Sequence, residues 1–238
     1  NRYVIIAGET SGDQHGSALM SEIKRIHAGN VEFWGIGGNK MLGAGLNQLE
    51  KIDNISVVGF TEALKKLPSI SRLLNRINQF ISETLPTGVI LIDYPGFNLK
   101  LAKKIKKRAP HINISFFISP QIWAWNERRI NIIKKCVDQM IVIFPFEKEY
   151  YKQHDINAIY VGHPFLDKWR VNDSLVLKNK LGLSNDKKII GIFPGSREQE
   201  LKIHLPIYLE AARRIHKTNQ GIEFAVGLAD VFKKESVR

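Results

Sequence analysis

Short runs of purely apolar residues alternate along this chain with stretches that have helical spacing. The apolar runs predict strands at residues 3–7, 32–36, 89–93, 112–118, 139–143 and 158–161. Between them, apolar residues recur at steps of three and four, which predicts helices at 17–28, 60–85 and 99–108. We expect Pro68 to break the second of these helices near its start. Strands that are apolar throughout must be covered on both faces, so the pattern predicts an α/β fold with a parallel sheet between layers of helices.

The alternation pauses between Pro164 and Lys188, where polar residues predict a linker. A strand at 189–193, a helix at 201–217 and a strand at 222–226 then form a second β-α-β unit. We therefore predict three segments: an N-terminal domain at 1–165, a linker at 166–188 and the start of a C-terminal domain at 189–238. About fifty residues are too few to close a core, and the chain does not begin with Met. We expect a partial chain with an incomplete second domain.

Composition narrows the class of protein. Apolar residues make up 44% of the chain and charged residues 24%, as in soluble globular proteins rather than disordered ones. The single cysteine, Cys136, excludes an internal disulfide framework and a cysteine-based zinc site. No apolar run approaches the roughly 18 residues of a membrane span. No basic-then-apolar leader precedes the first strand, so secretion is not predicted.

The net charge of +12 is the unusual feature of the composition. It favours anionic partners, which include nucleic acid, phosphorylated metabolites and an acidic membrane surface. Solubility alone explains it equally well. Lysines crowd the helix predicted at 99–108, and basic residues flank an apolar stripe at 64–70. Such a combination can rest on an anionic leaflet, and the alternative is a helix that packs on the core and exposes a basic face.

Two motifs follow predicted strands near the middle of the sheet. The sequence AGETSGD at 7–13 has glycines that permit a sharp turn at a helix N-terminus, where backbone N–H groups favour anions. Ser11 or Asp13 could cap that helix, and an ordinary tight turn is the alternative. Asp93 ends the 89–93 strand, where open α/β sheets place ligands. Its carboxylate could accept a proton from a sugar hydroxyl or could simply cap the next helix.

Three further motifs follow later strands. The loop SPQIWAW at 119–125 carries two tryptophans that could stack on a sugar or hold a lid, or one of them could cover the sheet. His163, in VGHP, could titrate near neutrality, although a histidine at such a turn is often structural. The turn PGSR at 194–197 offers backbone donors and the Arg197 guanidinium, which suit a nucleotide diphosphate. An ordinary capped turn with a solvated arginine is the alternative there.

Taken together, these motifs are far more specific than any one of them. They are AGETSGD at 7–13, IDYPGFN at 92–98, SPQIWAW at 119–125, FPFE at 144–147, VGHP at 161–164 and PGSR at 194–197. In this order and spacing the chain closely resembles the lipid-A-disaccharide synthase family, over nearly all of its length. The resemblance implies a GT-B glycosyltransferase, in which two Rossmann-like domains face a cleft. It implies an inverting reaction that joins UDP-2,3-diacylglucosamine to 2,3-diacylglucosamine 1-phosphate (lipid X) and releases UDP, without a metal or another cofactor.

The resemblance also assigns roles to residues. Asp93 matches the proposed general base on the 6-hydroxyl of the acceptor. The implied substrate-binding residues are Gly8, Glu9, Ser11, Gly12, Asp13, Asn98, Ser119, Gln121, Trp123, Trp125 and His163. The implied UDP-binding residues are Gly195, Ser196, Arg197 and Glu200. The implied membrane-contact residues are Leu64, Lys65, Lys66, Leu67 and Ile70.

The implied partners are the two lipid substrates and an anionic membrane surface. The expected location is the cytoplasmic side of the inner membrane of a Gram-negative bacterium, with peripheral attachment. A homodimer is allowed, and nucleic acid is not expected because no basic-aromatic platform is present. Gly96 stands where many relatives carry Asp, and the family extends well beyond residue 238. The alternatives are an inactive fragment that keeps membrane or partner binding, and another UDP-sugar enzyme of the same fold, such as a 2-epimerase or the peptidoglycan N-acetylglucosaminyltransferase.

Overall fold

The structure, a computed structural model, describes residues 1–55, 60–124, 126–168, 174–196 and 198–228. Within the helix that begins at residue 60, side chains are described from residue 67 onward. The chain divides into two compact units, Asn1–Lys168 and Trp169–Arg238. The division falls inside the predicted linker, and the boundaries at 165 and 188 stay predictions.

The first unit is built on a seven-stranded parallel sheet in the order β3-β2-β1-β4-β5-β6-β7. Its strands are β1 (Arg2–Ala7), β2 (Glu32–Gly37), β3 (Leu46–Lys51), β4 (Gly88–Ile92), β5 (Ile114–Phe117), β6 (Gln139–Val142) and β7 (Ala158–Tyr160). The order runs outward in opposite directions from β1 and β4, so the switch point of the sheet lies between these two strands. The sheet confirms the predicted α/β fold.

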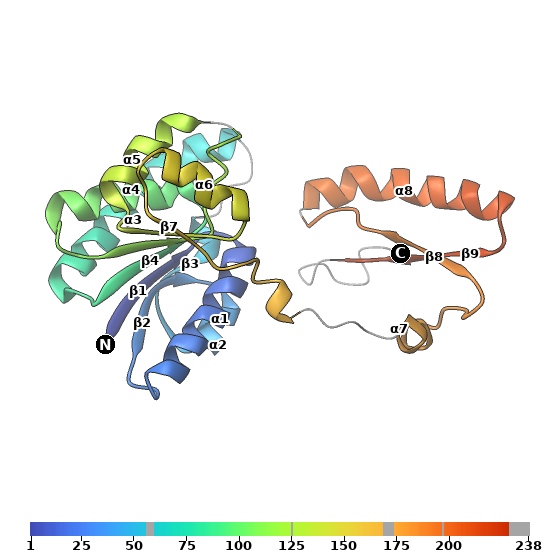
Figure 1. Cartoon of the computed structure of the whole chain (residues 1–238). Coiled ribbons are helices and arrows are strands. Elements are labelled where there is room, and N and C mark those ends of the chain that lie inside the picture. The colour runs from blue at the N-terminus through green and yellow to red at the C-terminus, as the bar shows by residue number, and fades with distance from the viewer. Residues whose placement is uncertain (56–59, 125, 169–173, 197, 229–238) are drawn as a thin grey trace. The chain divides into compact units, whose positions relative to one another are not determined.

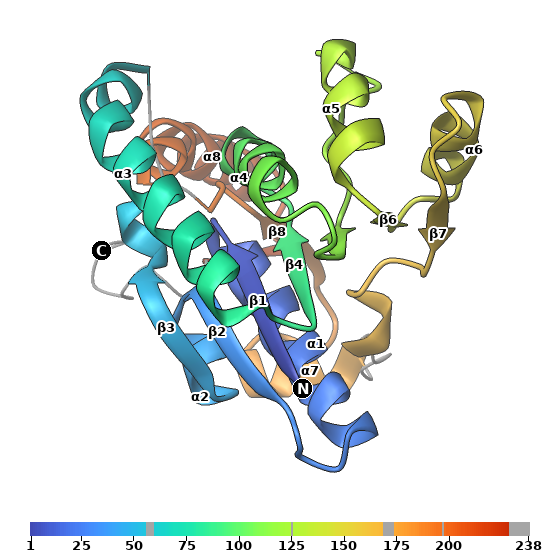
Figure 2. The ribbon, with the colours of Figure 1, turned by 90° about the vertical axis from the view of Figure 1, so that its left-hand side faces the viewer.

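Helices cover both faces of this sheet (Figures 1 and 2). On one face lie α1 (Thr10–Ile26) and α2 (Asn39–Gly43), and on the other lie α3 (Phe60–Thr84), α4 (Pro95–Arg108), α5 (Ile130–Cys136) and α6 (Pro145–Gln153). Alternate side chains of one strand enter the two cores: Val4 and Ile6 pack toward α3 and α4, whereas Ile5 and Ala7 pack toward α1. Both sets are fully buried, which explains why the strands are apolar throughout.

Several elements differ from the prediction. Helix α1 begins at Thr10 rather than at residue 17, and α2, β3, α5 and α6 were not predicted. A helix at Ser174–Leu181, inside the predicted linker, was not predicted either. Strand β3 lies at the edge of the sheet and is only partly buried, so its sequence lacks a continuous apolar run. Pro68 does not break α3. It lies on an exposed part of the helix, where water can replace the hydrogen bond that proline cannot donate.

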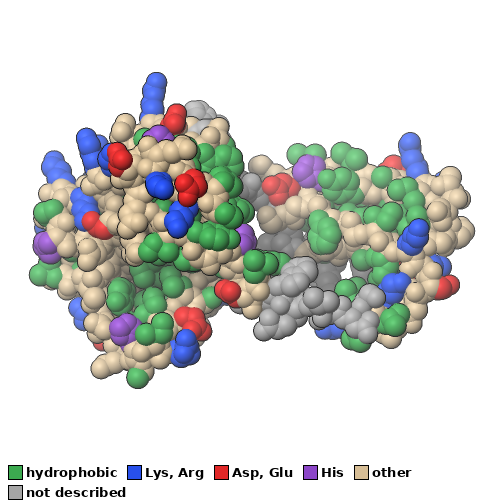
Figure 3. Space-filling model, viewed as in Figure 1, with side chains coloured by type: hydrophobic (Ala, Val, Ile, Leu, Met, Phe, Trp, Pro, Cys, Tyr) green, Lys and Arg blue, Asp and Glu red, His purple; other side chains and the backbone are tan. Residues whose placement is uncertain are grey.

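The second unit contains a parallel pair of strands, β8 (Lys188–Ile192) and β9 (Ile222–Val226), together with α7 (Ser174–Leu181) and α8 (Glu198–Thr218). Apolar side chains gather on its surface over α8 (Figure 3), where Ile203 and Ile207 are each 61% exposed. In the described part of this unit the buried hydrophobic residues are Ile192, Leu201, Leu205 and Ala212. Such a core is small for the apolar surface that it leaves exposed.

No helix in the described ranges combines the length and the apolarity needed to cross a bilayer.

Candidate active site

Two predicted motifs meet at the switch point of the sheet. The parallel register pairs Ala7 of β1 with Ile92 of β4, so Gly8 and Asp93 leave their strands at the same level. Asp93 is partly exposed, whereas Gly8 is buried. Because neighbouring chains diverge at a switch point, this edge of an open α/β sheet is where ligands bind.

An unusual backbone turn presents Asp93. Asp93 and Tyr94 have φ angles of 44° and 47°, so two consecutive residues with side chains adopt the left-handed conformation. Each such residue costs on the order of 1–3 kcal/mol and persists only where its surroundings enforce it. The Asp93 N–H donates to the Phe117 carbonyl (2.9 Å), and the Tyr94 hydroxyl donates to the Ile55 carbonyl (2.6 Å). These two bonds tie the turn to β5 and to the segment after β3.

The glycine after β1 makes room for this turn. A Cβ at Gly8 would clash with Cδ1 of Tyr94, because the two carbon atoms would be closer than van der Waals contact allows. Gly12 acts one turn later, where a Cβ would meet the Cβ of Ala7 at 3.3 Å. Gly8 and Gly12, which were predicted to bind a ligand, therefore allow the loop after β1 and α1 to pack closely against the sheet.

Burial controls the electrostatics of Asp93. Loss of water raises the pKa of its carboxyl group above the ordinary value, and the negative charge of nearby Glu9 raises it further. The backbone N–H of Tyr94 hydrogen-bonds to the carboxylate and opposes the rise. The same burial and the same Glu9 charge raise the pKa of the Tyr94 hydroxyl. A carboxylate with a raised pKa binds a proton more readily, which suits a general base.

Glu9 and Ser11 are exposed, and Glu9 is the N-cap residue of α1. No side chain caps this helix N-terminus, so the prediction that Ser11 or Asp13 caps it is wrong. Ser11, Gly12 and Asp13 belong to the first turn of α1 rather than to a loop.

Asp13 instead caps a different helix. Its carboxylate accepts the backbone N–H groups of Gly38 (2.8 Å), Lys40 (3.0 Å) and Met41 (3.0 Å) at the start of α2. The residue is only 5% exposed. Both oxygens are thus engaged away from solvent, and the structure gives Asp13 a structural contact where the sequence predicted a substrate contact.

Asn98 is also placed beneath the surface. It is completely buried, and its side-chain amide donates to the carbonyls of Ile92 (3.1 Å) and Asp93 (2.6 Å). It therefore contacts the turn that carries Asp93 rather than the open side of the site, where the sequence placed it.

The loop after β5 combines buried and exposed predicted residues. Ser119 is 5% exposed, and its hydroxyl lies 2.7 Å from that of Tyr151. Gln121 is exposed. Trp123 is 41% exposed and meets the ring of Phe146 edge to face, with centroids 5.0 Å apart. Trp125 lies outside the described residues.

His163 makes local contacts. Its Nδ1 accepts the N–H of Phe165 (3.1 Å), and its ring lies against Phe144, with centroids 5.9 Å apart. These contacts match the structural alternative, and the ring is still partly exposed.

Sequence reasoning missed a buried acid beside this loop. Glu147 is 1% exposed and accepts the backbone N–H of Phe144 (3.1 Å) at the start of α6. Burial raises the pKa of its carboxyl group, while hydrogen bonds that include those from Trp123 and Ser119 oppose the rise. Glu147 thereby links the loop after β5 to the loop after β6. Pro145 followed by a glutamate two residues later was the available signal, because this pattern is typical of a helix start.

In the second unit, the PGSR turn precedes α8. Gly195 has a φ of 122°, a conformation that residues with a side chain rarely adopt. The Ser196 N–H donates to the Glu200 carboxylate (2.9 Å), so a phosphate bound at this N–H would have to displace Glu200. Arg197 lies outside the described residues.

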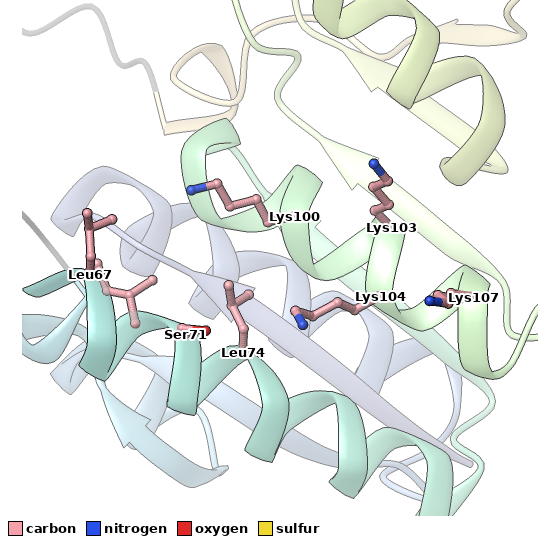
Figure 4. Close-up of a pocket in the computed structure, with 8 residues that line it drawn as sticks. Leu67, Ser71, Leu74, Lys100, Lys103, Lys104 and Lys107 are labelled. Atoms are coloured by element: carbon pink, nitrogen blue, oxygen red, sulfur yellow. The ribbon is translucent and has the colours of Figure 1, made fainter.

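A groove of about 410 Å³ separates α3 from α4 (Figure 4). Its apolar side includes Leu67, which is 48% exposed, and the buried Leu74. Its other side is a row of lysines on α4: Lys100, Lys103, Lys104 and Lys107. The ion pairs formed among described side chains involve none of these four. Ile70 also lines the groove, whereas the side chains of Leu64, Lys65 and Lys66 are not among those described.

Metal-binding side chains do not gather anywhere in the described ranges, which contain no group of three or more His, Cys, Asp or Glu able to hold an ion.

The Asp13 contact predicts a specific loss of stability. Asp13→Ala leaves three backbone N–H groups at the start of α2 without their acceptor. We expect the free energy of unfolding to fall by about 2 kcal/mol, as measured by urea denaturation followed by circular dichroism. Glu22→Ala, which removes an exposed acid from the same helix, is the control and should change stability little. Equal stability of the two variants would show that Asp13 does not support α2.

Comparison with known proteins places these features in a family. The family model described as lipid-A-disaccharide synthetase matches residues 3–238. Lipid-A-disaccharide synthase 1 of Legionella pneumophila is 38% identical over 100% of this chain and 62% of its own length. The enzyme of Nitrosococcus oceani is 39% identical over 97% of this chain and 59% of its own length. The chain thus spans about three fifths of the length of these relatives.

Solved structures share the fold. A putative UDP-N-acetylglucosamine 2-epimerase from Listeria monocytogenes superposes with a TM-score of 0.62 at 12% identity, over 94% of this chain and 61% of that one. The UDP-GlcNAc 2-epimerase of Neisseria meningitidis gives 0.62 at 9% identity, over 100% of this chain and 68% of that one. At such identities the likeness concerns the fold alone. The match to the family model over almost every residue shows that this chain belongs to the lipid-A-disaccharide synthase family.

Proposed function

We propose that this chain carries the acceptor side and part of the donor side of an inverting glycosyltransferase of lipid A biosynthesis. The reaction joins UDP-2,3-diacylglucosamine to lipid X and yields the β-1,6-linked disaccharide and UDP. The observation that carries the proposal is Asp93: a partly exposed carboxylate with a raised pKa, at the switch point of the sheet, in a member of this family.

In the proposed step, Asp93 takes the proton from the 6-hydroxyl of lipid X. The oxygen attacks the anomeric carbon of the donor sugar while the bond from that carbon to the UDP phosphate oxygen breaks. The configuration inverts because attack and departure occur on opposite faces of the ring. UDP leaves with the bonding electron pair, so donors near its phosphates stabilise the transition state more than the ground state.

For the departing UDP we propose the turn before α8. The left-handed Gly195 and the Ser196 N–H lie at the start of a 21-residue helix, whose N-terminus favours negative charge. Arg197 would add a charged fork for the diphosphate. Glu200 would then have to release Ser196 when UDP binds.

Other residues complete the proposed substrate site. Glu9, Ser11, Gln121, Trp123 and His163 have exposed or partly exposed side chains and stay candidates for direct contact. Trp125 is a further candidate on its sequence alone. We propose that Gly8, Gly12, Asp13, Asn98 and Ser119 act through packing and support.

We further propose that α3 and α4 rest on the anionic cytoplasmic face of the inner membrane, which both lipid substrates require. Leu67 and Ile70 would enter the leaflet, and the lysines of the α3–α4 groove would meet its phosphates. The stretch Leu64, Lys65 and Lys66 belongs to the same proposal on its sequence alone.

The base role predicts the effect of Asp93→Asn. The amide cannot accept the proton, so we expect kcat to fall about 100-fold or more with little change in the donor KM. Turnover is best measured in this chain joined to the C-terminal remainder of the Legionella relative, with UDP release followed in the presence and absence of lipid X. Near-normal kcat in the variant would remove Asp93 from the base role.

The same variant has a built-in stability control. Because folding raises the pKa of Asp93, ionisation of this group destabilises the folded state, and stability is lost as pH rises through the raised pKa. Asp93→Asn should therefore be at least as stable as the parent at neutral pH, so that lost turnover cannot be assigned to unfolding.

UDP release without lipid X would favour a 2-epimerase-like or hydrolytic activity. Absence of UDP binding in isothermal titration would favour the inactive fragment.

The membrane proposal predicts a loss of vesicle binding. Replacing Lys100, Lys103 and Lys107 with Gln should weaken co-sedimentation with anionic vesicles about tenfold or more, because each lysine near such a surface contributes roughly 1 kcal/mol. Leu67→Ser should weaken it further.

Matched controls remove the same charge and the same apolar surface elsewhere. They are Lys51→Gln with Lys148→Gln and Lys152→Gln, and Leu42→Ser, all at exposed positions. If the control triple variant loses as much binding as the groove triple variant, attraction depends on net charge and not on the groove.

A further inference from the structure

We propose that Asn98 is a positioning residue for Asp93: its buried amide holds the left-handed turn that aims the carboxylate. That Asn98 serves catalysis rests on the proposed function of Asp93. The contact between Asn98 and the turn does not depend on that function. Asn98 ends the first turn of α4, directly behind the point where β4 stops.

The geometry of the amide supports this role. One nitrogen, Nδ2, donates to two successive carbonyls, those of Ile92 (3.1 Å) and Asp93 (2.6 Å). The backbone N–H of the same residue donates to the Tyr94 carbonyl (3.1 Å). The side-chain amide of Asn98 therefore holds the two successive carbonyls of Ile92 and Asp93, and its backbone N–H makes a helical hydrogen bond at the start of α4.

The acceptor end of the Asn98 amide, Oδ1, differs from the donor end. Oδ1 of Asn98 is buried, and no described residue is its hydrogen-bond partner. An unpaired buried acceptor costs on the order of 1–3 kcal/mol, and a leucine of nearly the same shape would avoid that cost. The hydrogen bonds of the side chain to the turn are therefore made by the donor end of the amide.

The turn in turn controls the immediate surroundings of the carboxylate. Within this left-handed pair, the hydrogen bond from the Tyr94 N–H to the Asp93 carboxylate opposes the rise in the pKa of that group. From the facing loop after β1, the negative charge of Glu9 raises the pKa of Asp93. The same charge raises the pKa of the Tyr94 hydroxyl, the titratable group on the residue next to Asp93. A turn released from Asn98 would lose the Tyr94 N–H and would no longer hold the carboxylate in one direction.

The test is an NMR titration of the 238-residue chain. In the parent, the Tyr94 amide proton should shift as Asp93 ionises, because it donates to the carboxylate. In Asn98→Leu, which keeps the shape and removes both side-chain donors, we expect this response to fall about twofold or more. Asn78→Leu is the control: Asn78 lies on α3, is partly exposed as a residue, and also has a buried Oδ1 that finds no partner among the described residues.

Thermal unfolding shows how much each of the two variants is destabilised, and the Tyr94 amide response shows whether the turn has changed. Both substitutions remove an asparagine whose Oδ1 is buried, but only the one at residue 98 should change the Tyr94 response. A folded Asn98→Leu chain whose response equals that of the parent and of Asn78→Leu would overturn the proposal. If Asn98→Leu does not fold, Asn98→Ser decides: its single hydroxyl can hold one carbonyl, so a reduced response supports the role and an unchanged response overturns it.

This outcome is separate from that of the proposed function, because the titration requires no turnover. Normal kcat in Asp93→Asn would end the base role and leave the Asn98 contact standing.

Discussion

The left-handed pair at the end of β4 is the constraint on which the rest of the site depends. Asp93 and Tyr94 both adopt a conformation that residues with side chains avoid. A domain is stable by only about 5–15 kcal/mol, so such strain must be opposed locally. Gly8 makes room for the Tyr94 ring, the Ile55 carbonyl accepts a hydrogen bond from the Tyr94 hydroxyl, and the Asn98 amide holds two successive carbonyls of the turn. The loop after β1, the segment after β3 and the first turn of α4 therefore converge on the turn that carries Asp93.

This convergence gives Asp93 properties that an exposed aspartate lacks. Burial and the charge of Glu9 raise the pKa of its carboxyl group, which makes it a better proton acceptor and, at neutral pH, a source of instability. A strained and desolvated acid is what a site that needs a base is expected to contain. Asp13 shows the contrast, because its carboxylate is more deeply buried but is satisfied by three backbone N–H groups and supports α2.

The sequence revealed those features that depend on local pattern. The run at 89–93 is apolar because β4 is central and buried on both faces, and Asp93 could be found because it ends that run. What could not be read were contacts between distant segments. Asp13 caps a helix that begins 26 residues further along the chain. Residue 8 must be glycine because the ring of Tyr94, which follows a different strand, leaves no room for a side chain there. The family resemblance implied that Asn98 binds substrate, whereas its side chain is buried. Pro68 does not end α3 because its position is exposed, where water can replace the missing backbone hydrogen bond.

The central claim is that the carboxylate held by this turn is the group that accepts the substrate proton. It is tested most directly by measuring the pKa of Asp93 by carboxyl NMR and comparing it with the acid limb of the pH–kcat profile of the same active chain. The account predicts that the two midpoints coincide and that both lie above the ordinary value for aspartate, since protonated Asp93 cannot act as a base. A profile without an acid limb, or one whose midpoint is unrelated to the titration of Asp93, would contradict it.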